Sequence, residues 1–264
     1  MTQLFRLLAP LAALLATAAP VHAQTEPAKD AWNFNVGLGV VSQPDYPGSD
    51  SQKTRVAPLF IASKGPWFFG ALPNAGVPFG AGFNFVDTPT WRFGIAGGSG
   101  FAKPREESDD ARLAGLGDID NTAQLALFGS YAKDWFTARA AVTTDVGGNG
   151  HGTFALVDLE GRYHVSSRFW VSAAPGFTLA DRNRQQTFFG IDAEQSASSG
   201  RPQYHPEGGL NSWRLALGAN YGITPQFGLG GRVVFSRLQG DAARSPITQD
   251  ASQATLSIFT SYRF

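Results

Sequence analysis

The strongest constraint on the fold of this chain is a two-residue alternation of apolar and polar side chains, which recurs from Trp32 to the last residue, Phe264. Its first copy places an apolar residue at every second position: Trp32, Phe34, Val36, Leu38 and Val40. Asparagine and glycine fill the positions between them. Because successive side chains of a β-strand point to opposite faces, this period predicts a strand with one apolar side.

Further copies of the pattern cover most of the chain. They lie at 91–95, 125–131, 136–142, 154–163, 169–177, 213–221, 227–235 and 256–264, with weaker candidates near 54–62, 66–72 and 79–87. The opposite faces carry charged residues: Arg92, Arg139, Asp158, Glu160, Arg162, Arg214, Arg232 and Arg263. In a soluble β-sandwich these charges would lie on the outer surface. In a membrane barrel they would face the lumen, and the apolar set would face lipid.

The connections between these segments favour the membrane barrel. Tight turns at 64–65, 87–90, 133–134, 166–167 and 224–225 alternate with longer connections at 43–52, 73–78, 102–117, 147–152, 181–211 and 239–251. Short periplasmic turns and longer outer loops are typical of up-and-down outer-membrane barrels. The segment count predicts about 12 antiparallel strands with both termini in the periplasm. Ten strands remain the alternative, because the stretch 54–87 is rich in proline and glycine.

Aromatic residues lie beside nearly every expected periplasmic strand end. They are Trp32, Phe85, Trp91, Tyr131, Phe136, Tyr163, Phe169, Tyr221, Phe227, Tyr262 and Phe264. Such rings form girdles at the lipid–water boundary, whereas a soluble sandwich would distribute them through its core. We therefore expect an all-β transmembrane up-and-down barrel in contact with lipid, in the outer membrane of a Gram-negative bacterium.

The N-terminal residues and the composition agree with export. Residues 1–23 have the pattern of a cleaved signal peptide, with Arg6, an apolar run at 7–18 and a small-x-small site at 21–23. The expected organisation is a signal peptide at 1–23 and one barrel domain at 24–264. The chain has no cysteine, which excludes disulfides and thiolate chemistry. Its 21 basic and 21 acidic residues provide no basic field for nucleic acid, so no nucleic-acid partner is expected.

Candidate catalytic and metal-binding residues are few. His164 and Ser166 have the His-x-Ser spacing of lipid A deacylase barrels, where histidine is the base for a serine nucleophile. The expected topology places them at a periplasmic turn, so a polar turn is the favoured interpretation. An aspartyl-protease-like barrel would use rim residues such as Asp109, Asp110, Asp118, Asp120 and His151.

The acid-rich stretch 106–120 could also hold a cation through carboxylates, but it lacks the spacing of a calcium loop. Ordinary loop charge is the favoured interpretation of these acids. We therefore predict no catalytic, cofactor-binding or metal-ligating residue, no cofactor and no enzymatic activity. Charges of both signs at 158, 160 and 162 favour a lumen filled by ion pairs, with a narrow pore as the alternative.

Several segments resemble the MltA-interacting protein (MipA/OmpV) family of outer-membrane proteins. They are the sequences at 44–49 (PDYPGS), 116–120 (LGDID), 188–191 (FFGI), 194–200 (EQSASSG), 237–247 (RLQGDAARSPI) and 261–264 (SYRF). The resemblance implies a non-enzymatic scaffold that links a lytic murein transglycosylase to a bifunctional penicillin-binding protein in cell-wall assembly. Other members are described as porin-like, which leaves a narrow pore as the alternative function. Because murein enzymes act in the periplasm, such partners would bind the N-terminal segment, the turns or the lower rim, unless the long loops fold into the lumen.

Overall fold

The computed structural model describes residues 31–72 and 75–264. The expected signal peptide at 1–23 lies outside the described residues. No helix in the described part of the chain is long and apolar enough to cross a membrane.

Twelve antiparallel strands close into a barrel in which each strand pairs with its neighbours in the sequence, and β1 pairs with β12. The strands are β1 (Asn33–Pro44), β2 (Gln52–Lys64), β3 (Trp67–Leu72), β4 (Val77–Asp87), β5 (Trp91–Ser99), β6 (Gln124–Lys133), β7 (Phe136–Asp145), β8 (Thr153–His164), β9 (Phe169–Ala180), β10 (Gly209–Gly222), β11 (Phe227–Leu238) and β12 (Ser252–Arg263). The predicted fold class and the count of twelve are confirmed. The three weak candidates at 54–87 are all strands, which removes the ten-strand alternative.

The alternating apolar and polar positions of each strand lie on opposite faces of the barrel wall. Large apolar side chains are exposed on the outer face along the strands, among them Leu38, Val40, Val56, Ile95, Leu127, Leu159, Leu217, Leu256 and Ile258. Small residues such as Ala96, Ala126, Ala174 and Ala216 are buried on the inner face. A soluble sandwich would bury the large apolar set instead. The outer face is therefore a lipid-facing surface.

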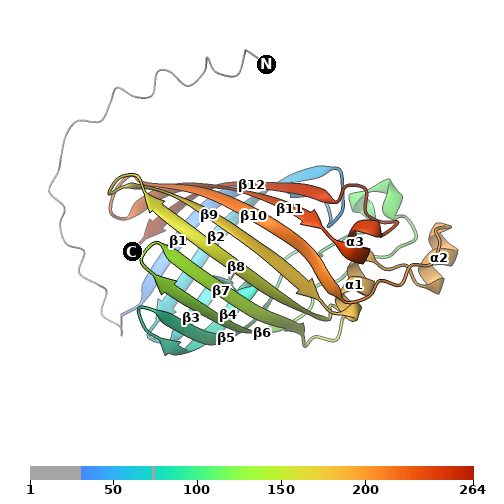
Figure 1. Ribbon diagram of the computed structural model, residues 1–264, viewed down its shortest axis with the longest axis horizontal. Helices are drawn as coiled ribbons and strands as arrows, with labels where there is room; N and C mark the ends of the chain where they lie inside the picture. Colours follow the sequence, from blue (N-terminus) through green and yellow to red (C-terminus); the bar gives the residue numbers. More distant parts are fainter. Residues whose placement is uncertain (1–30, 73–74) are drawn as a thin grey trace, which may run out of the picture.

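The two ends of the barrel differ, as the connector lengths predict (Figure 1). Both described chain ends and the tight turns lie at one end, which we call the turn end. Exposed aromatic residues surround it, among them Trp32, Trp67, Phe85, Trp91, Tyr163, Tyr262 and Phe264. Some of their rings touch, with centroids 4.8 Å apart for Trp91–Tyr131 and for Tyr262–Phe264. The predicted aromatic girdle is present.

The opposite end, which we call the loop end, carries the short helices of the long connections. These are η2 (Glu107–Asp109), η3 (Ala111–Leu113), α1 (Arg182–Phe189), α2 (Ala193–Ser199) and α3 (Gly240–Arg244). Figure 1 shows α1, α2 and α3 gathered beyond the strand ends.

The seam between the first and last strands contains one irregularity. Leu38 of β1 lies level with Thr260 of β12, but the Leu38 amide donates to the Thr260 hydroxyl at 3.4 Å rather than to a backbone carbonyl. The same hydroxyl lies 3.3 Å from the Leu38 carbonyl oxygen, to which it can donate. Regular strand pairing continues on both sides, at Val36↔Tyr262 and Gly39↔Phe259.

Candidate functional site

The long connections fold together into a cap at the loop end. One buried apolar cluster takes a residue from each of several connections: Tyr46, Leu113, Leu116, Ile191 and Ile247, with Tyr204 packed against it. A second cluster contains Ile119, Phe188, Phe189, Leu238 and Ala242. We call these two clusters and the helices that carry them the loop cap. Burial of apolar surface between connections far apart in sequence holds them over the mouth of the barrel.

The helices of the loop cap are fixed by capping residues. Asp181 caps α1, accepting from the Arg184 amide at 2.8 Å, and its second oxygen accepts from the Thr153 amide of β8 at 2.9 Å. Asp192 and Gln195 form a reciprocal capping box on α2. Gly200 ends α2 with the left-handed conformation that favours glycine.

Two arginines lie inside the loop cap in different environments. Arg105 is 2% exposed, and its Nη2 reaches the carbonyls of Leu116 and Gly117 only at 3.5 and 3.4 Å. Its Nε and Nη1 have no hydrogen-bond partner among the described residues. Burial lowers the pKa of Arg105 from its ordinary value. Arg201, in contrast, donates at 2.9 Å to the carbonyls of both Pro246 and Arg112, and so ties three connections together.

The acidic rim residues that the sequence suggested as candidates form ion pairs and turn hydrogen bonds. Asp109 pairs with Lys53 at 2.8 Å, and Asp110 pairs with Arg112 at 2.5 Å. Lys103 lies 2.9 Å from Asp118 and 2.8 Å from Asp120. No group of three or more potential metal ligands occurs within residues 31–72 and 75–264.

His151, the fifth rim residue, is buried in the loop cap. Its Nε2 lies 2.8 Å from the Asp120 carbonyl oxygen, and its ring stands edge-on to Phe188 at 5.4 Å between centroids. Burial lowers the pKa of His151 from its ordinary value. Its partners are a backbone carbonyl and an aromatic ring, which hold a neutral imidazole in place and present no nucleophile for it to activate.

His164 and Ser166 are exposed at the turn end, and no hydrogen bond joins their side chains. The Ser166 hydroxyl accepts from the backbone amides of Arg168 and Phe169, at 3.3 and 3.1 Å. This is a serine-stabilised turn that joins β8 to β9. The arrangement fits the turn interpretation favoured by the sequence.

The lumen contains the ion pairs expected from the alternating charges. Glu160 on β8 accepts from Arg139 of β7 at 2.7 Å and from Arg162 of its own strand at 3.2 Å. Asp158 accepts two hydrogen bonds from Arg214 of β10, at 3.0 and 2.7 Å. Each carboxylate therefore has at least one guanidinium partner.

These ion pairs do not fill the lumen. A cavity of about 510 Å³ lies beside them, lined by all five of these residues together with Arg232 and Trp170. Its walls carry four arginines against two carboxylates. Arg232 forms no ion pair in the described part of the chain, and Arg162 lies over the Trp170 ring with Cζ 4.5 Å from its centroid. The cavity therefore has a net positive lining. The charges of both signs at 158, 160 and 162 had indicated balanced ion pairs and no excess of arginine.

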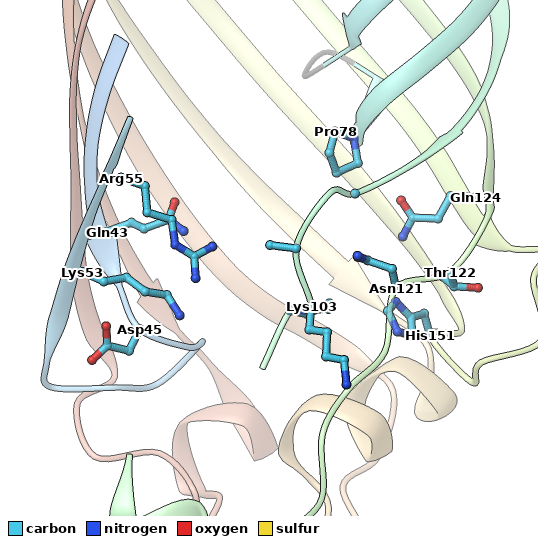
Figure 2. Close-up of a pocket in the computed structure, with 13 residues that line it drawn as sticks. Gln43, Asp45, Lys53, Arg55, Pro78, Lys103, Asn121, Thr122, Gln124 and His151 are labelled. Atoms are coloured by element: carbon cyan, nitrogen blue, oxygen red, sulfur yellow. The ribbon is translucent and has the colours of Figure 1, made fainter. Parts of the chain in front are cut away.

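A second cavity, of about 270 Å³, lies under the loop cap on the opposite side of the barrel. Lys53 and Arg55 of β2 enter it from one side, and Pro78, Lys103 and His151 border it from the other (Figure 2). Arg55 was not among the charged residues that the sequence pattern predicted to face the lumen. The period-two pattern could have identified it, since Arg55 lies on the face opposite Val56 in the weak strand candidate at 54–62.

Comparison with known proteins gives the family. Residues 36–264 match the family model described as MltA-interacting protein MipA. The chain belongs to the MipA family. It is 25% identical over 259 residues to the MltA-interacting protein of Escherichia coli (strain K12), across 96% of this chain and 97% of that protein. The MltA-interacting protein of Shigella flexneri matches to the same extent. The resemblance seen in the sequence is confirmed.

Solved structures show the same architecture for this MipA-family chain. An outer membrane channel from Pseudomonas putida F1 superposes with a TM-score of 0.50 at 11% identity, across 94% of this chain and 100% of that chain. At this identity the likeness shows the fold alone. Together with the lipid-facing wall, it places the chain among outer-membrane β-barrels.

Proposed function

We propose that this chain is a non-enzymatic scaffold of the outer membrane that binds a lytic murein transglycosylase and links it to a bifunctional penicillin-binding protein. The observation that supports the proposal is the match, over 96% of the chain, to relatives named MltA-interacting protein. The Ser166 hydroxyl is hydrogen-bonded to backbone amides and not to His164, and the rim acids are paired with lysine and arginine. These contacts therefore do not support a catalytic role as an alternative to the proposed one.

The turn end is the surface that such an enzyme would contact. Barrels of this class place their short turns in the periplasm, where murein lies. The turns expose apolar side chains beyond the strands, including Trp135, Val165 and Ile223. A concavity of about 240 Å³ opens beside the turn that joins β10 to β11, lined by residues that include Thr224, Gln226 and Arg263. The long loops fold into the cap at the other end, so the turn end is the binding surface we propose.

Co-purification from crosslinked envelopes tests this proposal. The wild-type barrel should recover a lytic transglycosylase, and the variant Val165→Asp/Ile223→Asp should recover less, because both changes add charge to the proposed contact surface. Glu194→Lys is the matched control, since Glu194 is an exposed charged residue on α2 at the loop end. Heat-dependent gel mobility would show that each variant folds. Repeated absence of any murein enzyme from the wild-type sample would overturn the proposal.

A second candidate function is a narrow pore with a preference for anions. The lumenal cavity of about 510 Å³, with four arginines against two carboxylates, favours it. Cationic lining attracts anions and concentrates them locally. Recordings of the folded protein in planar bilayers test this function, and a complete lack of conductance would rule it out. If the protein conducts, Arg232→Gln should reduce the preference for chloride over potassium.

A further inference from the structure

The barrel wall is incomplete beside strand β2. This strand pairs with β1 along its whole length, from Gln52 to Lys64. On its other side it pairs with β3 only from Ile61 to Lys64. Within residues 31–72 and 75–264, the segment 52–60 has no strand partner on that side. We call this opening the β2 gap.

The β2 gap exists because the β3–β4 hairpin bends into the barrel. Gly70 has a φ of +117°, which strongly favours glycine, and a Cβ there would lie 1.9 Å from the Phe60 carbonyl oxygen. Pairing of β3 with β2 ends at this residue, while pairing with β4 continues to Leu72↔Val77. The hairpin therefore leaves the wall at Gly70.

Contacts with the far wall hold the hairpin inside. The Thr143 hydroxyl of β7 donates to the Ala75 carbonyl at 2.7 Å, in a fully buried position. Gly76 lies so close to β8 that an added Cβ would come within 3.0 Å of the Phe154 and Leu156 side chains. Val77 is completely buried. The inward position is thus stabilised by packing as well as by a hydrogen bond.

The exposed edge of β2 is adapted to being unpaired. The backbone N–H and C=O of Leu38 on β1 point toward Thr260 of β12. Pro58 lies directly opposite Leu38 on β2, so this pair exchanges no backbone hydrogen bonds. The backbone of Pro58 therefore points toward the β2 gap. Proline has no N–H, and its place in sheets is an edge where no donor is needed. Unpaired backbone groups are costly next to hydrocarbon. An edge that faces the β2 gap therefore calls for a polar or amphiphilic occupant.

The cavity under the loop cap lies next to the β2 gap. Arg55 and Pro78 line it from the two sides, and both are exposed although they point into the barrel (Figure 2). Lys53 and Lys103 are paired with acids, whereas Arg55 has no ion pair or side-chain hydrogen bond among the described residues. On the outer face of the same strand, Val56 and Phe60 are exposed toward lipid. One unpaired cation thus lies beside an apolar route into the membrane.

We propose that the β2 gap is a lateral portal through which a single-chain amphiphile with a carboxylate head group enters this cavity from the membrane. The guanidinium of Arg55 binds the carboxylate, because its planar donors match the two oxygens. The hydrocarbon chain lies along Val56, Pro58 and Phe60. This site does not depend on the proposed docking of a murein enzyme, which uses the other end of the barrel.

Photocrosslinking in liposomes tests the portal. The folded full-length barrel is reconstituted with a long-chain fatty acid that carries a diazirine in its chain, and labelled residues are mapped by mass spectrometry. Label should concentrate on residues 54–60 and 78–104. Arg55→Gln should reduce that labelling roughly tenfold, the effect of losing a charge-assisted hydrogen bond. Arg55→Lys should restore part of it, because the charge is kept.

Two controls separate the portal from general membrane partitioning. Arg237→Gln removes an exposed arginine on β11 at the loop end and should leave labelling unchanged. A diazirine alkyl alcohol of the same chain length, which lacks the carboxylate, should label residues 54–60 weakly. Even labelling of the whole lipid-facing wall, or equal labelling of wild type and Arg55→Gln, would overturn the proposal. Neither result would bear on transglycosylase binding, which is measured separately.

Discussion

Arg214 on β10 and Asp158 on β8 form a two-pronged ion pair across the intervening strand β9, with Nε 3.0 Å from Oδ1 and Nη2 2.7 Å from Oδ2. The third nitrogen, Nη1, donates to the Thr178 hydroxyl of β9 at 2.9 Å. One guanidinium therefore links three adjacent strands on the lumenal face.

Removal of this link should weaken the barrel without preventing its assembly. We expect Arg214→Ala to lower the free energy of unfolding by roughly 1.5–3 kcal/mol, the range for hydrogen bonds to charged groups. The midpoint of urea unfolding in detergent measures the change. Arg232→Ala is the matched control, since it removes a lumenal arginine that has no ion pair among the described residues. Equal losses for the two variants would contradict the prediction.

Arg105 and Arg201 in the loop cap should respond in opposite ways to replacement by methionine. Arg105→Met should leave the cap as stable or make it more stable, because a poorly paired buried charge gives way to an apolar side chain of similar length. Arg201→Met should loosen the cap by about 1–3 kcal/mol, because two partly buried carbonyls lose a charged donor. Rates of limited proteolysis of the loops measure both effects. Faster cleavage of Arg105→Met than of Arg201→Met would contradict this view.

The loop cap should loosen as the pH falls, through His151. Burial is the main cause that lowers the pKa of this histidine below 6.5, with Arg184 acting in the same direction, while the Asp120 carbonyl and Asp145 oppose it. The unfolded chain therefore takes up a proton before the folded cap does. The stability that neutral His151 contributes is complete above about pH 6.5 and declines as the pH falls below that value.

Hydrogen exchange of the loop amides measures this dependence. Exchange in the loop cap should accelerate between about pH 7.5 and about pH 5 beyond the intrinsic change, since protonation disfavours the buried state. His151→Gln should flatten the additional acceleration. His205→Gln, at an exposed loop histidine, should not alter it. An unchanged profile in His151→Gln would show that another group is responsible.

Gly70 should be far less tolerant of alanine than Gly117, although both have a positive φ. Gly70→Ala should sharply reduce the yield of folded barrel, because its Cβ would collide with the backbone of β2. Gly117→Ala is the control, with a φ of +72° and open space around the added carbon. It should cost only the backbone strain of about 1–2 kcal/mol. Refolding yield, read from heat-dependent gel mobility, distinguishes the two, and a normal yield for Gly70→Ala would contradict the observed path of β3.

The strands were predictable from sequence because their signal is local. A period of two is imposed on every strand by lipid on one side and the lumen on the other, so residues such as Leu38 and Ile258 identify their own face. The turn chemistry is equally local, as at Ser166. The boundaries of β3 were recovered as well, although its neighbours are rich in glycine.

The loop cap and the β2 gap were not predictable, because both depend on contacts between distant residues. One buried cluster contains both Leu116 and Ile247, from connections more than a hundred positions apart, and no local sequence pattern predicts it. Helix α2 is an exception, because the Asp192–Gln195 capping box and Gly200 are local signals of its two ends. Pro58 is a local signal of an edge strand. The inward bend at Gly70, in contrast, depends on contacts between the hairpin and the opposite wall, which the local sequence does not indicate.

The seam between β1 and β12 is the joint of the ring at which no loop connects the two paired strands. Its ladder is interrupted at Leu38 and Thr260, yet the Phe264 amide still donates to the Phe34 carbonyl at 3.0 Å. Both ends of the part of the chain that the structure describes therefore lie at the same rim. A short linker from Phe264 to residue 31 would turn this joint into one more hairpin of the turn end. The ring could then be cut at any other turn, which makes the barrel a natural subject for circular permutation.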